Sequence, residues 1–309
     1  MTEHPPVSIV VSTMGQRETY LKEAIDSFLA QDYPGHITVI VSFDKSEPDE
    51  SLVQELPRRR VRVIRNTRTP GLPGSRNAGI MAAETDLVAF CDDDDLYLPG
   101  KITAQVMAIR SSPRSVAVFC GQQVFRNDSE WTVDQIHPAP EITLSDLLRR
   151  RHAVAQSVTL MVRKSMLLED GVGLFAEDLP GGYGEDYEML IRLARHSPIL
   201  SVPEVHVRVR VNPASYFTRR WEMISDALRW MLERYPEFQT VPRGYARIAG
   251  QIAFAHAALH DRRGALRWAW TTFRASPLEP RTYIVLPMVA RLVEPEFVQR
   301  RLAAFGYGF

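Results

Sequence analysis

The sequence has few of the residues that mark a secreted or membrane-embedded protein. Only two cysteines, Cys91 and Cys120, occur in 309 residues, and both lie inside apolar runs. This predicts buried, reduced thiols and argues against a disulfide scaffold or a cysteine-based zinc site. No run approaches the roughly 18 apolar residues of a membrane span. The N-terminus lacks a basic segment and a long apolar run, so no signal peptide is predicted. We therefore expect a soluble, cytoplasmic protein.

The chain also lacks an excess of charge of either sign. Thirty-seven basic residues balance thirty-seven acidic ones, so no overall field attracts nucleic acid or a membrane. The two arginine triplets, 58–60 and 149–151, are short, and we interpret both as solvated turns or helix ends. With 45% hydrophobic residues the chain is ordinary for a globular protein. Its function must therefore come from a local site.

What the first half does contain is an alternation of strand-like and helix-like segments. The predicted strands are residues 7–12, 37–42, 61–65 and 87–92, with helices at about 20–29 and 74–83 between them. Repeated βα units of this spacing favour a mostly parallel sheet flanked by helices. Such sheets bind ligands outside the carboxyl ends of their strands. Polar residues that directly follow these strands are thus candidate site residues.

The second half has a different pattern. Further strands are predicted at 116–125, 157–162 and 205–211, with a helix at 185–195, and then four amphipathic helices at 219–235, 242–259, 262–275 and 279–292. We place a boundary near Asn212 to Phe217. This divides the chain into a catalytic domain of residues 1–215 and a helical domain or extension of residues 216–309.

The strongest chemical signal is the segment FCDDDDLYLPGK, which begins at Phe90. Four carboxylates at the end of a buried strand repel one another, which is costly unless a cation neutralises them. Mg²⁺ and Mn²⁺ take such oxygen ligands, together with substrate phosphates. The alternative is a polar cap at a strand end. Strand alternation would direct Asp92 and Asp94 to the ion, and Asp93 and Asp95 towards ribose, backbone amides or a helix N-terminus.

This segment closely resembles the F-L-D-x-D-D-x-x-x-P motif of family 2 glycosyltransferases, which adopt the GT-A fold, a Rossmann-like α/β architecture. The opening, VSIVVSTMGQRETYLKEAIDSFLAQDYPGHITVIVSFDKS, also resembles the start of that family, and the likeness extends over about residues 5–215. The resemblance implies an inverting transferase that uses a nucleotide-sugar donor. It implies that Thr13 contacts the nucleotide, and we expect Asp92 and Asp93 to take part in binding the nucleotide sugar. It also implies that Asp44 accepts a hydrogen bond from the base, although Asp44 could simply start a turn.

Two further segments match motifs of the same family. GLPGSRNAGI (71–80) is similar to G-x-x-x-A-R-N-x-G, which implies that Arg76 contacts the nucleotide or a phosphate and that Asn77 orients a neighbouring loop. The alternative is a helix start with an exposed arginine. LPGGYGEDYEMLIRLARH (179–196) is similar to a glycine loop followed by E-D-x-x-L-x-x-R-L. This implies Asp186 as the catalytic base, with Glu185 supporting acceptor binding, although helix capping alone would explain both acids.

The remaining predictions concern the acceptor and the metal. Gly181 and Gly182 are predicted to let an acceptor approach the backbone, and the acceptor class is open: a glycan, a lipid-linked saccharide, a protein or a small metabolite. Asn212 stands where the family often has a histidine that contributes to the metal or diphosphate. The expected cofactor is Mn²⁺ or Mg²⁺, and the default donor is a UDP-sugar. The C-terminal helices could contact an acceptor, a membrane surface or a second copy of the chain.

Three other classes of protein fit the sequence less well than a glycosyltransferase does. A nucleotidyltransferase should have a basic glycine-rich loop after the first strand, but STMGQRETY has one glycine and no lysine. A dinucleotide-dependent oxidoreductase should have G-x-G-x-x-G there, and it is absent. A catalytically silent sugar-binding or scaffold protein is disfavoured by the intact acids at 92–95 and 185–186. The sequence therefore predicts a metal-dependent glycosyltransferase.

Overall fold

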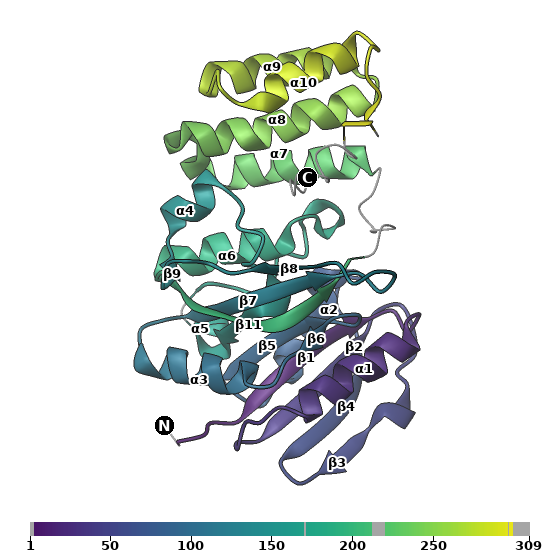
Figure 1. Cartoon of the computed structure of the whole chain (residues 1–309), viewed down its shortest axis with the longest axis vertical. Coiled ribbons are helices and arrows are strands. Elements are labelled where there is room, and N and C mark those ends of the chain that lie inside the picture. The colour runs from purple at the N-terminus through teal and green to yellow at the C-terminus, as the bar shows by residue number, and fades with distance from the viewer. Residues whose placement is uncertain (1–2, 170, 212–219, 296, 299–309) are drawn as a thin grey trace. The chain divides into compact units, whose positions relative to one another are not determined.

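The computed structural model describes residues 3–169, 171–211, 220–295 and 297–298 of the chain (Figure 1). The chain forms two compact units. The first comprises Met1–Leu144, Arg151–Glu177 and Glu185–Pro213, and the second comprises Ser145–Arg150, Asp178–Gly184 and Ala214–Phe309. The expected boundary near Asn212 to Phe217 lies outside the described residues, so the division at residue 215 stays a prediction.

A single twisted sheet forms the core of the first unit. Its strand order is β3-β4-β2-β1-β5-β10-β7-β11-β6, with β8 paired to β7 and β9 paired to β11. The strands are β1 Val7–Thr13, β2 Ile37–Phe43, β3 Gln54–Leu56, β4 Arg59–Arg65, β5 Leu87–Asp92, β6 Leu96–Tyr97, β7 Ala117–Phe125, β8 Thr132–Gln135, β9 Glu141–Ile142, β10 Leu160–Arg163 and β11 Ile199–Arg210.

The strands β4, β2, β1 and β5 are parallel, as the βα alternation predicts. Strand β1 is buried along its whole length, which explains its β-branched composition. Ser12 on β1 pairs with Asp92 on β5 and with Ser42 on β2. The carboxyl ends of these strands therefore lie at one level of the sheet. Strand β10 runs antiparallel between β5 and β7.

Helices cover both faces of this sheet. Helices α1 (Glu18–Leu29) and α3 (Lys101–Ser111) pack on the face that carries Val7, Ile9 and Val11. Helix α2 (Leu72–Ala82) packs on the opposite face, where a Cβ on Gly79 would lie 2.3 Å from Val10 Cγ1. The unit also contains α5 (Lys164–Leu168) and α6 (Glu185–His196). Both cysteines are buried free thiols, as predicted.

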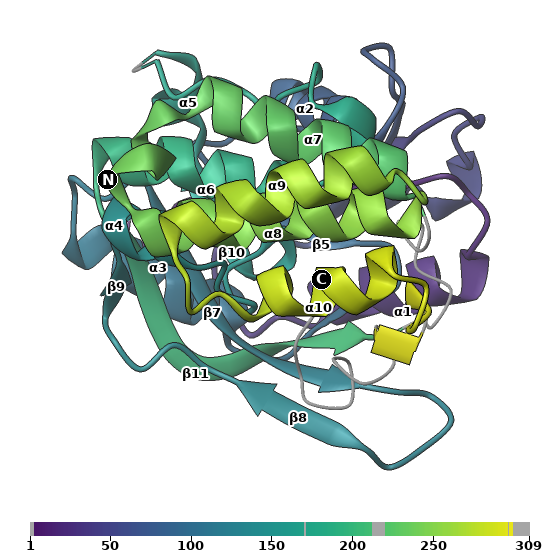
Figure 2. The ribbon, with the colours of Figure 1, turned by 90° about the horizontal axis from the view of Figure 1, so that it is seen from above.

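The second unit is helical. Its helices are α7 Trp221–Arg234, α8 Pro242–Ala258, α9 Arg262–Ala275 and α10 Pro280–Val289, and α4 (Leu144–Arg149) lies mostly within it. All four C-terminal helices begin and end within a few residues of the predicted bounds. Helix α8 lies between α7 on one side and α9 and α10 on the other (Figures 1 and 2). Within the described ranges, every helix is too short or too polar to cross a bilayer.

Several elements differ from the prediction. Strand β11 begins at Ile199 rather than at residue 205, and residues 157–159 form a 3₁₀ turn before β10. The short strands β3, β6, β8 and β9 were not predicted. Each has two to four residues, too few for a period-2 pattern to appear in the sequence.

Candidate active site

The four aspartates lie at the carboxyl end of the parallel strands, as predicted. Strand β5 ends at Asp92, Asp93 and Asp94 form a turn, and β6 begins directly after Asp95. The expected alternation therefore stops at Asp92, because a turn does not direct successive side chains to opposite faces. Each carboxylate instead accepts a hydrogen bond, and Asp93 and Asp94 share Arg17 as a donor.

The partners divide the run differently from the predicted pairing. Asp93 accepts hydrogen bonds from Thr13 Oγ1 at 2.7 Å and from Arg17 Nη1 at 3.1 Å. The same Arg17 nitrogen also donates to Asp94 Oδ2. Asp95 accepts a bond from the backbone N–H of Arg210 at 2.8 Å, and such an amide contact is one of those expected for it. Thr13 and Arg17 thus hold the turn in place.

Burial makes these carboxylates costly to ionise. It raises the pKa of Asp94 to about 6, although Arg17 acts in the opposite direction. It also raises the pKa of Asp93 and of Asp95, and repulsion from Asp92 adds to both effects. A group of carboxylates in this condition is stabilised by any additional cation, which is the electrostatic requirement for a divalent ion.

Arg76 connects the aspartate run to the start of helix α6. It is 1% exposed, and its two terminal nitrogens donate to Asp92 Oδ1 at 2.7 Å and to Glu185 Oε1 at 2.5 Å. Burial disfavours the charged form of the Arg76 guanidinium and so lowers its pKa. The attraction of the two carboxylates outweighs the effect of burial, so the pKa of Arg76 lies above its ordinary value. The alternative of an exposed arginine at a helix start is wrong. Arg76 brings together two acidic motifs that are 93 positions apart in the chain.

Glu185 is a buried carboxyl beside that arginine. Burial raises its pKa to about 7, Arg76 lowers it, and the neighbouring Asp186 raises it further. The Glu185 carboxyl therefore remains protonated to a higher pH than an ordinary glutamate does. Carboxyls displaced in this way by burial and a specific charge cluster at functional sites.

Asp186, the predicted base, is held by an arginine that the sequence analysis did not connect with it. Arg151 Nη2 lies 3.0 Å from Oδ1 and 2.9 Å from Oδ2. Oδ1 also accepts the backbone N–H of Tyr187 at 2.7 Å. Arg151 was expected in a solvated turn or at a helix end, and it lies just after the end of α4 (Leu144–Arg149). Its side chain is 38% exposed and forms this ion pair, which the sequence did not predict.

Asp44 and Asn77 stabilise loops next to the strand ends. Asp44 accepts bonds from Asn66 Nδ2 at 2.8 Å and from the Gly71 N–H at 3.0 Å, so its carboxylate connects the end of β2 with the loop before α2. Asn77 bonds the backbone of Phe175 in both directions and also donates to Glu177. Asn77 thus orients the neighbouring loop, as predicted. A base contact by Asp44 stays a prediction.

The glycine loop before α6 belongs to the second unit. Gly181 has φ 59° and Gly182 has φ 69°, a left-handed conformation that favours glycine. A Cβ on Gly181 would lie 2.0 Å from Met223 Sδ, so a larger residue there would displace the Met223 side chain as well as strain the backbone. An acceptor contact at these two residues stays a prediction.

The carboxylates fit a divalent ion as a partial site. Among the described residues, no group of three or more histidine, cysteine, aspartate or glutamate side chains is arranged to hold a metal. Asp92 Oδ2 and Asp94 Oδ1 nevertheless accept no side-chain hydrogen bond from the described part of the chain, whereas the other oxygen of each carboxylate binds Arg76 or Arg17. Mg²⁺ and Mn²⁺ sites of this kind use one or two carboxylates and take their other ligands from substrate phosphates and water. Asn212 lies outside the described residues.

Sequence reasoning missed two residues that contact the predicted ones, Arg17 and Arg151. Arg17 follows β1 by four positions, within the polar loop at a strand end, and that position could have marked it as a candidate. Arg151 gave no comparable signal, because nothing local connects it with a helix that starts at residue 185. Both contacts depend on the tertiary structure.

Comparison with known proteins finds a matching family model and several relatives. A family model described as Glycosyl transferase family 2 matches residues 8–170. An uncharacterised glycosyltransferase of Rickettsia typhi is 27% identical over 218 residues, which are 69% of this chain and 66% of that protein. The chain thus spans just under two thirds of that relative. A glucosyltransferase of Escherichia coli, whose name gives UDP-Glc as donor and α-D-GlcNAc-diphosphoundecaprenol as acceptor, is 22% identical over 74% of this chain and 88% of its own length.

Solved structures show the same fold. TarS 1–349 of S. aureus, determined in complex with UDP-GlcNAc, superimposes with a TM-score of 0.60 and 15% identity over 98% of this chain and 93% of that one. A mannosyltransferase of Pyrobaculum calidifontis in complex with GDP-Man and Mn²⁺ gives a TM-score of 0.57 and 18% identity over 98% and 81%. The predicted GT-A fold class is confirmed.

Proposed function

This chain belongs to glycosyl transferase family 2, and from that premise we propose that it transfers a sugar from a nucleoside-diphosphate sugar to an acceptor hydroxyl or amine with inversion. The observation that carries the proposal is the bridge by Arg76, which is bonded to Asp92 at one motif and to Glu185 at the other. The group expected to face the donor and the group expected to face the acceptor thus share one buried cation. A single displacement needs both within reach of one anomeric carbon.

On the donor side, Asp92 and Asp94 would hold the metal through Oδ2 and Oδ1 respectively, the carboxylate oxygens that accept no side-chain hydrogen bond from the described residues. The ion, when bound, neutralises charge on the diphosphate. Asp93 is hydrogen-bonded to Thr13 and Arg17. These three residues would contact the nucleotide or its phosphates. The raised pKa of Asp94 supports a role in cation binding, since a divalent ion offsets the cost of its ionisation.

On the acceptor side, Asp186 acts as the base. Its Oδ1 accepts two hydrogen bonds from the described residues, whereas Oδ2 accepts one, from Arg151. A carboxylate oxygen has two acceptor positions, so Oδ2 retains one for the acceptor proton. The acceptor oxygen or nitrogen forms a bond to the anomeric carbon, its proton passes to Oδ2, and the bond from that carbon to the diphosphate oxygen breaks. The nucleoside diphosphate leaves with the electron pair.

Glu185 and Arg151 position this base. Glu185 is fixed by Arg76, and Arg151 neutralises Asp186 while it is ionised. Because a carboxylate is a weak base, orientation and stabilisation of the leaving group must provide much of the acceleration. Gly181 and Gly182 are proposed to admit the acceptor to the backbone.

For the substrates we propose a UDP-sugar donor and a lipid-linked saccharide acceptor. Support comes from the printed substrates of the E. coli relative and from the UDP-GlcNAc complex of TarS. The Mn²⁺ in the mannosyltransferase complex supports the same ion here. A silent sugar-binding protein is the remaining alternative, and self-association through the C-terminal helices stays a prediction.

The test is a screen followed by turnover. Purified protein is heated with each nucleotide sugar, with and without Mn²⁺, and the melting temperature is recorded. We expect a UDP-sugar to raise it in an Mn²⁺-dependent way. The best donor is then incubated with Mn²⁺, and release of free sugar or of a transferred product is followed by mass spectrometry. Stabilisation without any turnover, including hydrolysis, would favour the silent binding protein.

A further inference from the structure

Helix α9 exposes apolar side chains that its own unit does not cover. Leu266, Trp270 and Phe273 are all exposed, and Trp270 reaches 61%. With 3.6 residues per turn, these positions lie on one side of the helix. The rings of Trp270 and Phe273 stack at a centroid distance of 5.7 Å, which fixes two large aromatic surfaces next to each other in solvent. Single exposed apolar residues are ordinary, but an aligned group of this size marks a contact surface.

Helix α10 and the turn before it extend this surface. Tyr283 and Leu286 of α10 are exposed, and Leu278 in the α9–α10 turn is 85% exposed. Helices α9 and α10 pack against each other and against α8, and both lie on the side of α8 that faces away from α7 (Figure 1). We define the α9–α10 face by Leu266, Trp270, Phe273, Leu278, Tyr283 and Leu286.

The same segment carries a strong local excess of positive charge. Residues 262–292 contain six arginines and one acidic residue, Glu279, a net charge of +5 in a chain whose overall net charge is zero. Glu279 is itself paired with Arg281. Arg263, Arg267 and Arg274 are exposed positions of α9, adjacent in helical projection to the apolar ones.

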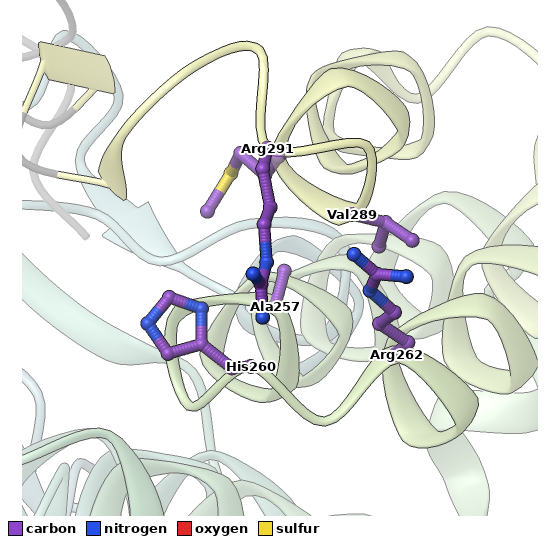
Figure 3. Close-up of a pocket in the computed structure, with 6 residues that line it drawn as sticks. Ala257, His260, Arg262, Val289 and Arg291 are labelled. Atoms are coloured by element: carbon purple, nitrogen blue, oxygen red, sulfur yellow. The ribbon is translucent and has the colours of Figure 1, made fainter.

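A shallow basic hollow lies at one end of this surface. Arg262 begins α9 and Arg291 follows α10, and their guanidinium groups reach into the same small space as the ring of His260 (Figure 3). Ala257, Met288 and Val289 complete the lining, so no carboxylate is among the lining residues. Within the described ranges, neither arginine forms an ion pair with an acidic side chain. The hollow is therefore suited to an anionic group.

We propose that the α9–α10 face docks on an anionic lipid surface, with the apolar side chains entering the headgroup boundary and the surrounding arginines contacting lipid phosphates. Helices with tryptophan, phenylalanine and leucine on one side and arginine beside them bind bilayers in this way. A second copy of the chain is a poorer occupant, because a symmetric dimer would place this positive face against itself. The proposal goes beyond the transferase activity and does not depend on it.

The strength of such docking should depend on both kinds of residue. Each arginine near an anionic surface contributes about a fivefold gain in membrane partitioning. Reversal of three exposed arginines should therefore weaken binding by at least about a hundredfold. Salt should weaken it further, because the Debye length falls to about 3 Å at molar salt.

The experiment is vesicle flotation of the full chain without any substrate. One set of vesicles contains phosphatidylcholine alone, and the other contains phosphatidylcholine mixed with phosphatidylglycerol. We expect the parent protein to float with the mixed vesicles at low salt. In the presence of vesicles of phosphatidylcholine alone, we expect it to remain unbound at the bottom of the gradient. Trp270→Ala should reduce flotation, and the triple variant Arg263→Glu, Arg267→Glu, Arg274→Glu should abolish it.

Matched controls come from the first unit. Met107→Ala removes an exposed apolar side chain from α3, and Arg114→Glu reverses an exposed charge, and neither should change flotation. Circular dichroism confirms that each variant is folded. Equal flotation of the parent and Trp270→Ala would overturn the proposal, as would a parent that binds neither vesicle. A dimer in sedimentation velocity that Trp270→Ala dissociates would assign the face to a second copy. Donor hydrolysis, measured without lipid, tests the transferase separately.

Discussion

Arg151 donates one nitrogen, Nη2, to both carboxylate oxygens of Asp186, at 3.0 Å and 2.9 Å. The arginine is 38% exposed at its side chain, whereas the carboxylate is 9% exposed. The carboxylate is therefore held inside the protein, whereas the arginine side chain is partly open to solvent. The carboxylate proposed as the base is thus oriented by Arg151.

Asp186→Asn should abolish transfer while nucleotide binding persists. The amide keeps the shape of the side chain but cannot accept the acceptor proton, and loss of a general base typically costs 10²–10⁴-fold in rate. Transfer rates and calorimetric titration with UDP and Mn²⁺ measure the two properties. Arg151→Lys is the companion variant, and it should retain part of the activity because it keeps a cation beside Asp186. Turnover of Asp186→Asn near the parent rate would remove Asp186 as the base.

Asp94→Asn should weaken nucleotide binding in the presence of Mn²⁺ and leave binding without metal nearly unchanged. The amide preserves volume but removes the charge that attracts the ion. We expect a loss of at least on the order of tenfold, since even residues that only orient metal ligands contribute that much. Calorimetry with and without Mn²⁺ provides the comparison. An equal loss in both conditions would mean that Asp94 acts without a metal.

Arg17→Ala should strengthen Mn²⁺ binding, whereas Asp94→Asn should weaken it. Arg17 pairs with both Asp93 and Asp94, and its side chain is 42% exposed. It therefore competes electrostatically with a divalent ion for the negative charge of Asp94. Its removal should tighten Mn²⁺ binding by up to about fivefold, the value of an ion pair with an exposed partner. Mn²⁺ titration in the absence of nucleotide measures this, with Arg17→Lys as the charge-conserving control. Weaker Mn²⁺ binding in Arg17→Ala would show that Arg17 supports the site.

Arg76→Met should destabilise the protein strongly. The guanidinium is buried and satisfies both Asp92 and Glu185, so its loss leaves the buried Glu185 carboxyl without its partner. Breaking a buried pair in this way costs about 3–5 kcal/mol. Addition of Glu185→Gln to the same variant should recover part of the loss. Arg62→Met, which breaks the exposed pair with Glu84, is the matched control and should cost no more than about 1 kcal/mol. Urea unfolding gives all three values, and equal costs for Arg76→Met and Arg62→Met would contradict the prediction.

Glu185 should make stability depend on pH. Its pKa rises from the ordinary 4.5 to about 7 in the folded protein. Between these values the folded state binds more protons than the unfolded state, so the free energy of unfolding falls as pH rises through this window and is level above it. Melting temperatures from pH 4.5 to 8 should therefore decline less in Glu185→Gln than in the parent. Parallel curves for the two proteins would show that the carboxyl is already ionised throughout.

Most of the elements and the position of the candidate site can be predicted from the sequence alone. Strand β1 is a short run of β-branched residues that is buried throughout, and helices α8 and α9 have apolar residues at helical spacing. Both patterns are visible in the local sequence. The aspartate run could be placed at a strand end for the same reason. Repeated βα units then brought the carboxyl ends together.

Which charged side chains meet depends on the three-dimensional arrangement of the sheet and the loops. Arg76 and Glu185 are 109 positions apart, and Arg151 and Asp186 are 35 apart. No local pattern specifies such pairs, because an ion pair depends on where the sheet and the loops bring two residues in space. The alternation of the aspartates failed for a related reason, since β5 ends at Asp92 and the next two residues form a turn. Hydrophobic periodicity is a property of neighbours in sequence, whereas the charges of this site are balanced between neighbours in space.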